Sequence, residues 1–325
     1  MDDTAYAILS VLPDSSGEKA GVLAKKLGID KKALLKSCKR LEGYGYLTIR
    51  KPFLRDYRIS KTSKFLASPS DCRIISIVNH KGGVGKTTTA VNLAACLAKL
   101  GKKTLLVDLD PMANASSMLG LGKDAACSIY DTLSMETEAL ETIVATGYGF
   151  DVIPSEVDLV GLELEILRLE NREARLAQML DPIKKGYEYI IIDCPPSLNI
   201  MTINALTCSD SILIPVQADQ YAIESLKILT KVVELVRDRL NPGISIGAAV
   251  ITMHDPSSDF SNSIVEQVKS MLKERLYDTC IVRDVRVSQA AAEGKPLIHY
   301  DHMLDASKQY MKVTERLIED EGKRI

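Results

Sequence analysis

Short apolar runs alternate with stretches of helical periodicity over most of the chain. The first of these runs covers residues 74–78 and is followed by a glycine-rich segment and a helical pattern over 87–100. Continuous apolar strands separated by helices are typical of a mostly parallel sheet with both faces covered. The pattern therefore predicts an α/β fold with flanking helices. The further strands that it predicts are residues 103–109, 150–153, 189–192, 211–216 and 244–251.

The N-terminal part of the chain has a different pattern. A short apolar helical pattern over residues 4–12 ends at Pro13. Two further helical stretches, the second over residues 31–41, are separated by Gly28 and by Asp30, which is placed to cap the helix at 31–41. Two strand-like runs follow over residues 46–50 and 56–60. This order of elements resembles a winged helix-turn-helix. The fold class predicted for the whole chain is therefore α/β with a small N-terminal winged helix-turn-helix domain.

Charge separates these two parts of the chain. Residues 1–70 contain 14 Lys and Arg against 7 Asp and Glu, whereas the remainder contains 27 against 36. A basic module attached to an acidic one often contacts nucleic acid. In a winged helix, the helix predicted at residues 31–41 would enter the major groove with Lys31, Lys32 and Lys36 facing outward, and the wing at residues 51–55 would lie along the DNA backbone. Winged helices also bind proteins, so both kinds of ligand stay open for this part.

The glycine-rich segment after the first strand carries the clearest chemistry. Gly85-Lys86-Thr87 fits the end of the phosphate-binding pattern G-x-x-x-x-G-K-[ST], although His80 stands where its first glycine is expected. Backbone N–H groups of such a loop turn toward phosphate oxygens, and the following helix adds its positive end. Lys86 would reach the β- and γ-phosphates, and Thr87 would bind Mg²⁺. This P-loop predicts ATP and Mg²⁺ as cofactors.

A second lysine, Lys81, precedes Lys86 by five residues in the sequence K-G-G-V-G-K-T-T. This is the deviant Walker A motif, and through it the chain resembles the ParA/MinD group of dimeric ATPases, most closely the ParA/Soj-type partitioning ATPases. The resemblance covers roughly residues 73–320. It implies a homodimer with two ATP molecules between the subunits, in which Lys81 contacts the phosphates bound to the partner. The catalytic residues that it implies are Lys81, Lys86 and Asp110.

Two further motifs carry the resemblance. KTLLVDLDP at residues 103–111 resembles the family's second motif, and YIIIDCPPSL at 189–198 resembles its Walker B strand and the loop after it. The resemblance implies that Asp110 orients or activates the attacking water. It also implies that the ends of the two strands support Mg²⁺. The implied metal-site residues are Thr87, Asp108 and Asp193.

The segments expected near the base of the nucleotide match the family less closely. Residues 251–255 and 281–296 resemble the family segments beside the adenine, but Val282 replaces a proline and Asp284 an asparagine. Met112 stands where the family has a glutamine, in the switch region. The nucleotide-binding residues implied by the resemblance are Lys81, Gly82, Gly83, Val84, Gly85, Lys86, Thr87, Thr88, Met253, Arg283 and Val285.

DNA binding is implied by fewer residues. Arg286 matches an arginine implicated in non-specific DNA binding by ATP-bound dimers, whereas Ser257 stands in the place of a second such arginine. Other basic residues or the N-terminal domain would then supply the missing contact. The predicted DNA-binding residues are Arg286, Lys31, Lys32 and Lys36.

The resemblance implies a chromosome or plasmid partitioning ATPase. Its ATP dimer would bind DNA without sequence preference, and a ParB-like centromere-binding protein would stimulate hydrolysis and release the dimer. One alternative is an ATP-switched transcriptional autorepressor that acts through the winged helix. Another is a MinD-like positioning ATPase. The acidic residues of the tail at 307–325 are unlike the basic amphipathic helix that anchors MinD proteins to membranes.

The composition of the chain indicates the cellular compartment in which this function would take place. The chain has no run of about 18 apolar residues and begins with an acidic segment, so neither a membrane span nor a secretory signal is expected. Its seven cysteines are scattered without a C-x-x-C pair, which favours reduced thiols in a cytoplasmic protein. The resemblance implies that this protein is associated with the nucleoid. No membrane partner is expected. The predicted domains are a winged helix-turn-helix at residues 1–62, a linker at 63–72 and the ATPase at 73–325.

Overall fold

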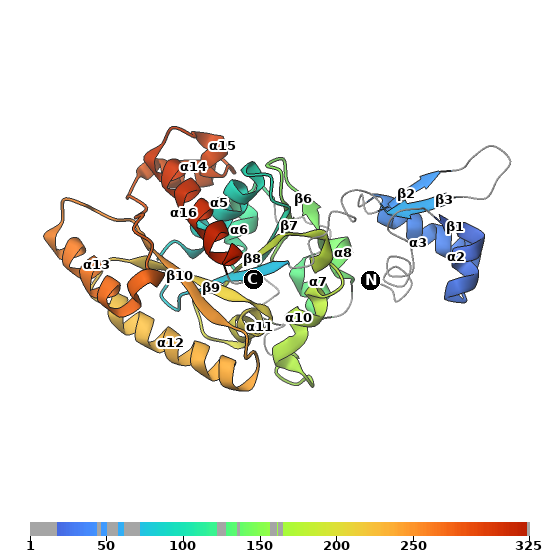
Figure 1. Cartoon of the computed structure of the whole chain (residues 1–325), viewed down its shortest axis with the longest axis horizontal. Coiled ribbons are helices and arrows are strands. Elements are labelled where there is room, and N and C mark those ends of the chain that lie inside the picture. Colours follow the sequence, from blue (N-terminus) through green and yellow to red (C-terminus); the bar gives the residue numbers. More distant parts are fainter. Residues whose placement is uncertain are drawn as a thin grey trace.

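Most of the predicted ATPase part and several N-terminal elements can be placed in the structure, which is a computed structural model (Figure 1). The helix predicted at 4–12, the wing predicted at 51–55 and nearly all of the predicted linker lie outside the described residues. The described residues are 18–43, 47–50, 58–61, 72–121, 128–134, 137–156, 161 and 165–323.

A seven-stranded sheet lies at the centre of the larger part, in the order β10-β9-β4-β8-β5-β7-β6. All neighbours are parallel except β7 and β6, which pair antiparallel at the edge. The predicted mostly parallel sheet is therefore confirmed. β6 has only two residues, too few to show a periodic signal in the sequence. The strands are β4 (Arg73–Ile77), β5 (Thr104–Asp108), β6 (Val144–Ala145), β7 (Asp151–Ile153), β8 (Tyr189–Asp193), β9 (Ser211–Gln217) and β10 (Ser245–Thr252).

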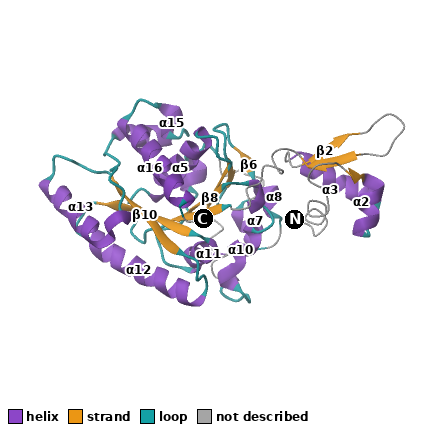
Figure 2. Ribbon diagram, viewed as in Figure 1, coloured by secondary structure: helices purple, strands orange, loops and turns teal. Residues whose placement is uncertain are grey.

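Helices lie on both sides of this sheet (Figure 2). Among the described residues, none of them has the length and apolar composition that a bilayer crossing requires. The helices are α5 (Lys86–Lys99), α6 (Asn114–Ser117), α7 (Ile129–Leu133), α8 (Ala139–Thr142), α10 (Arg175–Leu180), α11 (Ile200–Cys208), α12 (Ala222–Arg239), α13 (Asp259–Leu272), α14 (Val285–Ala292), α15 (Leu297–Tyr300) and α16 (Asp305–Gly322), with short 3-10 turns at Arg172–Ala174, Lys184–Gly186 and Lys273–Arg275.

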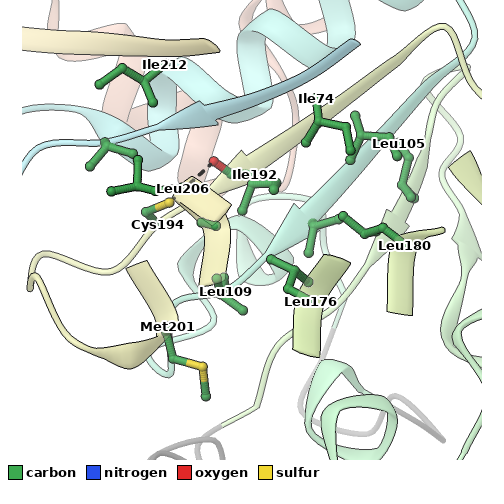
Figure 3. Close-up of a cluster of buried hydrophobic side chains, with 14 of the residues drawn as sticks. Ile74, Leu105, Leu109, Leu176, Leu180, Ile192, Cys194, Met201, Leu206 and Ile212 are labelled. Carbon is green, nitrogen blue, oxygen red and sulfur yellow. Dashed lines mark hydrogen bonds between the residues drawn. The ribbon is translucent and has the colours of Figure 1, made fainter. Parts of the chain in front are cut away.

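Successive side chains of the central strands enter two different hydrophobic cores, because strand side chains alternate between faces. Leu106 of β5 and Ile191 of β8 pack with residues of α5 and α16. Their neighbours Leu105 and Ile192 pack on the opposite face with residues of α10, α11 and α12. Figure 3 shows part of this second core, where Leu176 and other aliphatic side chains converge. Burial on both faces explains why these strands read as continuous apolar runs.

The two described N-terminal helices and two of the three described strands match those expected from the sequence, whereas the two-residue strand at Glu18–Lys19 was not predicted. Gly28 ends the first helix in a left-handed conformation with φ 65°, and Asp30 Oδ2 accepts hydrogen bonds from the backbone of Lys32 at 2.9 Å and Ala33 at 3.2 Å. The second helix buries Leu34 and Cys38. The winged-helix assignment itself stays a prediction. The elements are β1 (Glu18–Lys19), α2 (Ala20–Leu27), α3 (Lys31–Gly43), β2 (Leu47–Arg50) and β3 (Arg58–Lys61), with the three strands in an antiparallel sheet of order β1-β3-β2.

Candidate nucleotide-binding site

A pocket of about 1100 Å³ lies beyond the carboxyl ends of the central parallel strands. Ligands of open α/β sheets bind at this edge. The glycine loop and the start of α5 form one side, and residues 281–285 with α14 form another. We call these sides the phosphate end and the base end. The pocket brings together ten predicted site residues: Gly82, Gly83, Gly85, Lys86, Thr87, Thr88, Asp110, Met253, Arg283 and Val285.

The glycine loop takes a course that requires left-handed backbone. Gly83 has φ 74° and Gly85, the N-cap of α5, has φ 83°. Residues with a Cβ rarely adopt these angles. The hydroxyl of Thr252 at the end of β10 donates a 2.8 Å hydrogen bond to the Val84 carbonyl and so fastens the loop to the sheet. The loop thereby presents the positive end of α5 to the pocket, as anion binding requires.

Lys86 supplies a buried cation at the phosphate end. Its side chain is only 6% exposed, and its Nζ donates a 3.0 Å hydrogen bond to the carbonyl of Lys81. Burial lowers the pKa of Lys86, whereas the nearby carboxylates of Asp193 and Asp110 raise it. A buried ammonium group that donates to a neutral carbonyl would gain a stronger partner in a phosphate oxygen.

Lys81 lies differently, and the described lining of the pocket does not include it. Its Nζ forms an ion pair with Asp219, in the turn after β9. Its backbone N–H donates to Asn79 Oδ1 at 3.1 Å. The structure therefore holds this amine within its own subunit. The predicted contact of Lys81 with a partner's nucleotide concerns a second subunit and stays a prediction.

Two buried carboxylates lie at the ends of neighbouring strands. The first of them already accepts hydrogen bonds from other residues of the protein. Asp108 ends β5, and burial raises its pKa to about 6. Its Oδ2 accepts from the backbone and hydroxyl of Ser116 at 2.8 and 2.7 Å, and its Oδ1 accepts from the Asp110 backbone at 3.2 Å. Asp108 is therefore placed to fix the segment that carries Asp110.

The second carboxylate, Asp193 at the end of β8, accepts no such backbone hydrogen bonds from the residues that the structure describes. Both of its side-chain oxygens are buried without a hydrogen bond of good geometry. Burial raises its pKa well above the usual value and Asp108 raises it further, while the Thr87 hydroxyl lies near enough to lower it. Buried polar groups are nearly always partnered in folded proteins. Asp193 and Thr87 together therefore fit a hard divalent cation that takes oxygen ligands, such as Mg²⁺.

Asp110 adds a carboxylate to the wall of the pocket. Its Oδ1 accepts from the backbone of Met112 at 3.0 Å, and its backbone oxygen accepts from Ala113 at 2.8 Å. The Met112 side chain is 71% exposed and lines the same pocket. A carboxylate held in this way beside the loop and Lys86 can accept a hydrogen bond from a water molecule near bound phosphates.

The base end is built from two backbone segments that lie side by side. The His254 N–H donates to the Ile281 carbonyl at 2.9 Å, and the Arg283 N–H donates to the His254 carbonyl at 3.1 Å. Met253 has a left-handed conformation with φ 51°. Val285 is largely exposed at the mouth of the pocket. Paired backbone and partly or fully exposed side chains therefore form this end, including the charged Arg283 and Asp284, while buried charge gathers at the phosphate end.

Arg286 has an anionic partner in the chain itself. Its Nη2 lies 2.6 Å and its Nε 2.9 Å from oxygens of Asp284, which also caps α14 by accepting from the Arg286 N–H. This pairing lowers the pKa of Asp284 and raises that of Arg286. The other predicted DNA-binding residues belong to α3. They are the exposed lysines Lys31, Lys32 and Lys36.

Some residues of this site carry no local sequence signal. Ser116 follows Asp108 by eight positions and Asp219 follows Lys81 by 138, and no spacing rule connects them. A parallel sheet with a glycine loop, a buried lysine at the start of a helix and two carboxylates at strand ends defines a P-loop NTPase.

Comparison with known proteins assigns the chain to a family within this class. A family model described as an AAA domain matches residues 72–246. The chain is 45% identical over 247 residues to the sporulation initiation inhibitor protein Soj of Bacillus subtilis, with 75% of this chain and 98% of that protein covered. It is 40% identical over 261 residues to the chromosome partitioning protein ParA of Caulobacter vibrioides, with 79% and 98% covered. The chain belongs to the ParA/Soj family of partitioning ATPases.

Solved structures support the same fold. A Mycobacterium smegmatis structure, described as cobyrinic acid a,c-diamide synthase with bound ADP and magnesium, matches with a TM-score of 0.70 and 25% sequence identity. The match covers 78% of this chain and 97% of that one. About a quarter of the present chain therefore has no counterpart in Soj or in this structure.

Proposed function

We propose that the chain forms an ATP-dependent homodimer that binds DNA without sequence preference and is released when a ParB-like partner stimulates hydrolysis. The observation that carries this proposal is the phosphate end of the pocket. There Lys86 lies beside the glycine loop, near the buried carboxylate of Asp193, which accepts no hydrogen bond of good geometry among the described residues. Membership of the ParA/Soj family supports partition of a chromosome or plasmid as the purpose. The dimer would then be found on the nucleoid.

Different residues at the phosphate end would have different roles in hydrolysis. The loop amides and Lys86 would bind the phosphates, and Asp110 would orient the attacking water. Thr87 and Asp193 would hold Mg²⁺, in keeping with the magnesium and ADP named for the Mycobacterium smegmatis structure. When bound, the ion would offset negative charge on the phosphoryl group. Asp108 would act indirectly, through the segment that carries Asp110.

In this proposal, the Lys81 side chain makes the contact that joins the two subunits of the dimer. Its amine lies outside the described lining of its own pocket, on the side of the turn after β9. A second cation supplied by the partner would add to Lys86 in stabilising the charge of the phosphates. ATP would thereby join the two subunits, and its hydrolysis would separate them.

A salt-dependent DNA-binding assay on the full chain tests this function. The Asp110→Ala variant, which should keep its ATP, would be titrated onto an unrelated DNA duplex with ATP, ADP or no nucleotide. Binding should require ATP and weaken steeply with salt, because phosphate contacts release counterions. The same variant with Lys81→Ala should lose the binding. Equal affinity with ADP would contradict the proposed switch.

A second candidate function is transcriptional autorepression. The observation in its favour is the pair α2 and α3, a helix–turn–helix arrangement in which α3 exposes several lysines. Footprinting of the full chain on the promoter of its own gene would test it. Replacement of Lys31, Lys32 and Lys36 by alanine should remove any protection, whereas replacement of Lys25 and Lys26 on α2 serves as the control. A footprint that survives the α3 changes would contradict this role.

A further inference from the structure

The side chain of Lys81 is held by a carboxylate that belongs to another part of the same subunit. Asp219, in the turn between β9 and α12, forms an ion pair with the Lys81 amine, and the two side chains are 26% and 27% exposed for Lys81 and Asp219. The second oxygen of Asp219 accepts a 3.0 Å hydrogen bond from the Tyr221 backbone. That bond fixes the direction in which the carboxylate points. The amine is therefore held at a defined place.

The backbone of Lys81 is anchored separately from its side chain. Asn79 is buried, and its Oδ1 accepts from the Lys81 N–H at 3.1 Å and from the Ser225 hydroxyl at 2.7 Å. Its Nδ2 donates to the Pro215 carbonyl at 2.8 Å. These bonds tie the start of the glycine loop to β9 and α12. The flexible stem of a lysine can therefore carry the amine to a new partner while the loop keeps its course.

We propose that Asp219 is a positioning residue, which retains the Lys81 amine in the single subunit and releases it when two ATP-bound subunits meet. This inference rests on the proposed function, in which Lys81 binds the phosphates of the partner's nucleotide. A triphosphate bears more negative charge than one carboxylate and attracts the amine more strongly. The retained state opposes dimerisation in the absence of that triphosphate.

The expected change in the association constant of the dimer follows from the solvent exposure of the Lys81–Asp219 ion pair. Partly exposed pairs change an equilibrium by up to about fivefold. A two-fold symmetric dimer breaks the pair twice, once in each subunit. Removal of the Asp219 charge should therefore raise the association constant of the ATP dimer by up to about 25-fold.

The experiment compares the full chain with its Asp219→Asn variant. Both would be studied by sedimentation equilibrium with Mg²⁺ and a non-hydrolysable ATP analogue. We expect Asp219→Asn to dimerise more tightly, with the difference shrinking as salt screens the ion pair in the unchanged chain. Glu224→Gln is the matched control, because Glu224 is an exposed carboxylate in the first turn of α12. It should leave the association constant unchanged.

The outcomes separate this inference from the proposed function. Asp219→Glu keeps the charge and should stay near the unchanged chain, which distinguishes loss of charge from damage to the turn. Equal or weaker dimerisation of Asp219→Asn, measured while Lys81→Ala loses the dimer, overturns the retaining role alone. A dimer that persists in Lys81→Ala would instead overturn the proposed role of Lys81 at the interface.

Discussion

The two ends of the nucleotide pocket are built on different principles. The phosphate end concentrates buried charge, with Lys86 and Asp193 set beside a loop that has two left-handed glycines. The base end consists of paired backbone segments and of side chains that are partly or fully exposed, among them the charged Arg283 and Asp284 and the apolar Val285. Charged groups in a buried setting tolerate little change, whereas backbone contacts persist under many side chains. The contrast explains how the base end can depart from the family sequence while the glycine loop keeps its form.

The largest effect should follow from Lys86→Ala at the phosphate end. Removal of this buried ammonium group leaves the phosphates without a charge-assisted partner, and ATP affinity should fall by about 1000-fold. Titration of the full chain with a fluorescent ATP analogue measures the loss. Lys99→Ala, at the exposed opposite end of α5, should bind normally. Comparable ATP affinity of the Lys86→Ala and Lys99→Ala variants would contradict the proposed role of the phosphate end in ATP binding.

Asp110→Ala should separate catalysis from binding at the same end. Loss of the carboxylate that orients water should lower turnover by about 100-fold while ATP affinity stays within about twofold. Phosphate release and nucleotide titration on one preparation would give both values. Turnover close to that of the unchanged chain would remove Asp110 from the catalytic role.

Asp193→Asn should weaken the use of Mg²⁺ and stabilise the nucleotide-free protein by about 2 kcal/mol, because an unpartnered buried carboxylate is costly. Its folded-state pKa lies well above the ordinary 3.8, so the folded chain retains a proton that the unfolded chain has lost. The cost therefore grows as pH rises above about 4. Urea unfolding of both proteins without nucleotide should give a stability difference that widens between pH 4.5 and 7. A constant difference would contradict the burial of an unpartnered charge.

The smallest effect belongs to the base end. Asp284→Asn can still cap α14 but no longer pairs with Arg286, so the arginine becomes available to phosphates. DNA affinity of the ATP dimer should rise by about threefold, and the slope of log K against log salt should steepen by about 0.9. Glu315→Gln, at an exposed carboxylate of α16, is the control. An unchanged slope would mean that Arg286 does not contact DNA.

Predictions from the sequence succeeded wherever neighbouring residues act together. The glycine loop, the capped start of α3 and the alternating strands were all foreseen, and the sheet followed from the apolar runs. β1 and β6 were missed because strands of two residues show no periodic pattern. Ten of the predicted site residues do line one pocket. Their individual roles, the domain boundaries and the winged helix remain predictions.

The sequence by itself determined the class of site, since consecutive glycines, a lysine and a threonine form a phosphate loop through local backbone geometry. Only the tertiary structure decided which charges are satisfied. It placed the Ser116 donors beside Asp108, left both oxygens of Asp193 without a hydrogen bond of good geometry among the described residues, and paired Lys81 with Asp219. These partners come from different strands and turns, and the parallel sheet brings their ends to one edge. The free energy of a buried or paired charge depends on such neighbours, which no local pattern in the chain records.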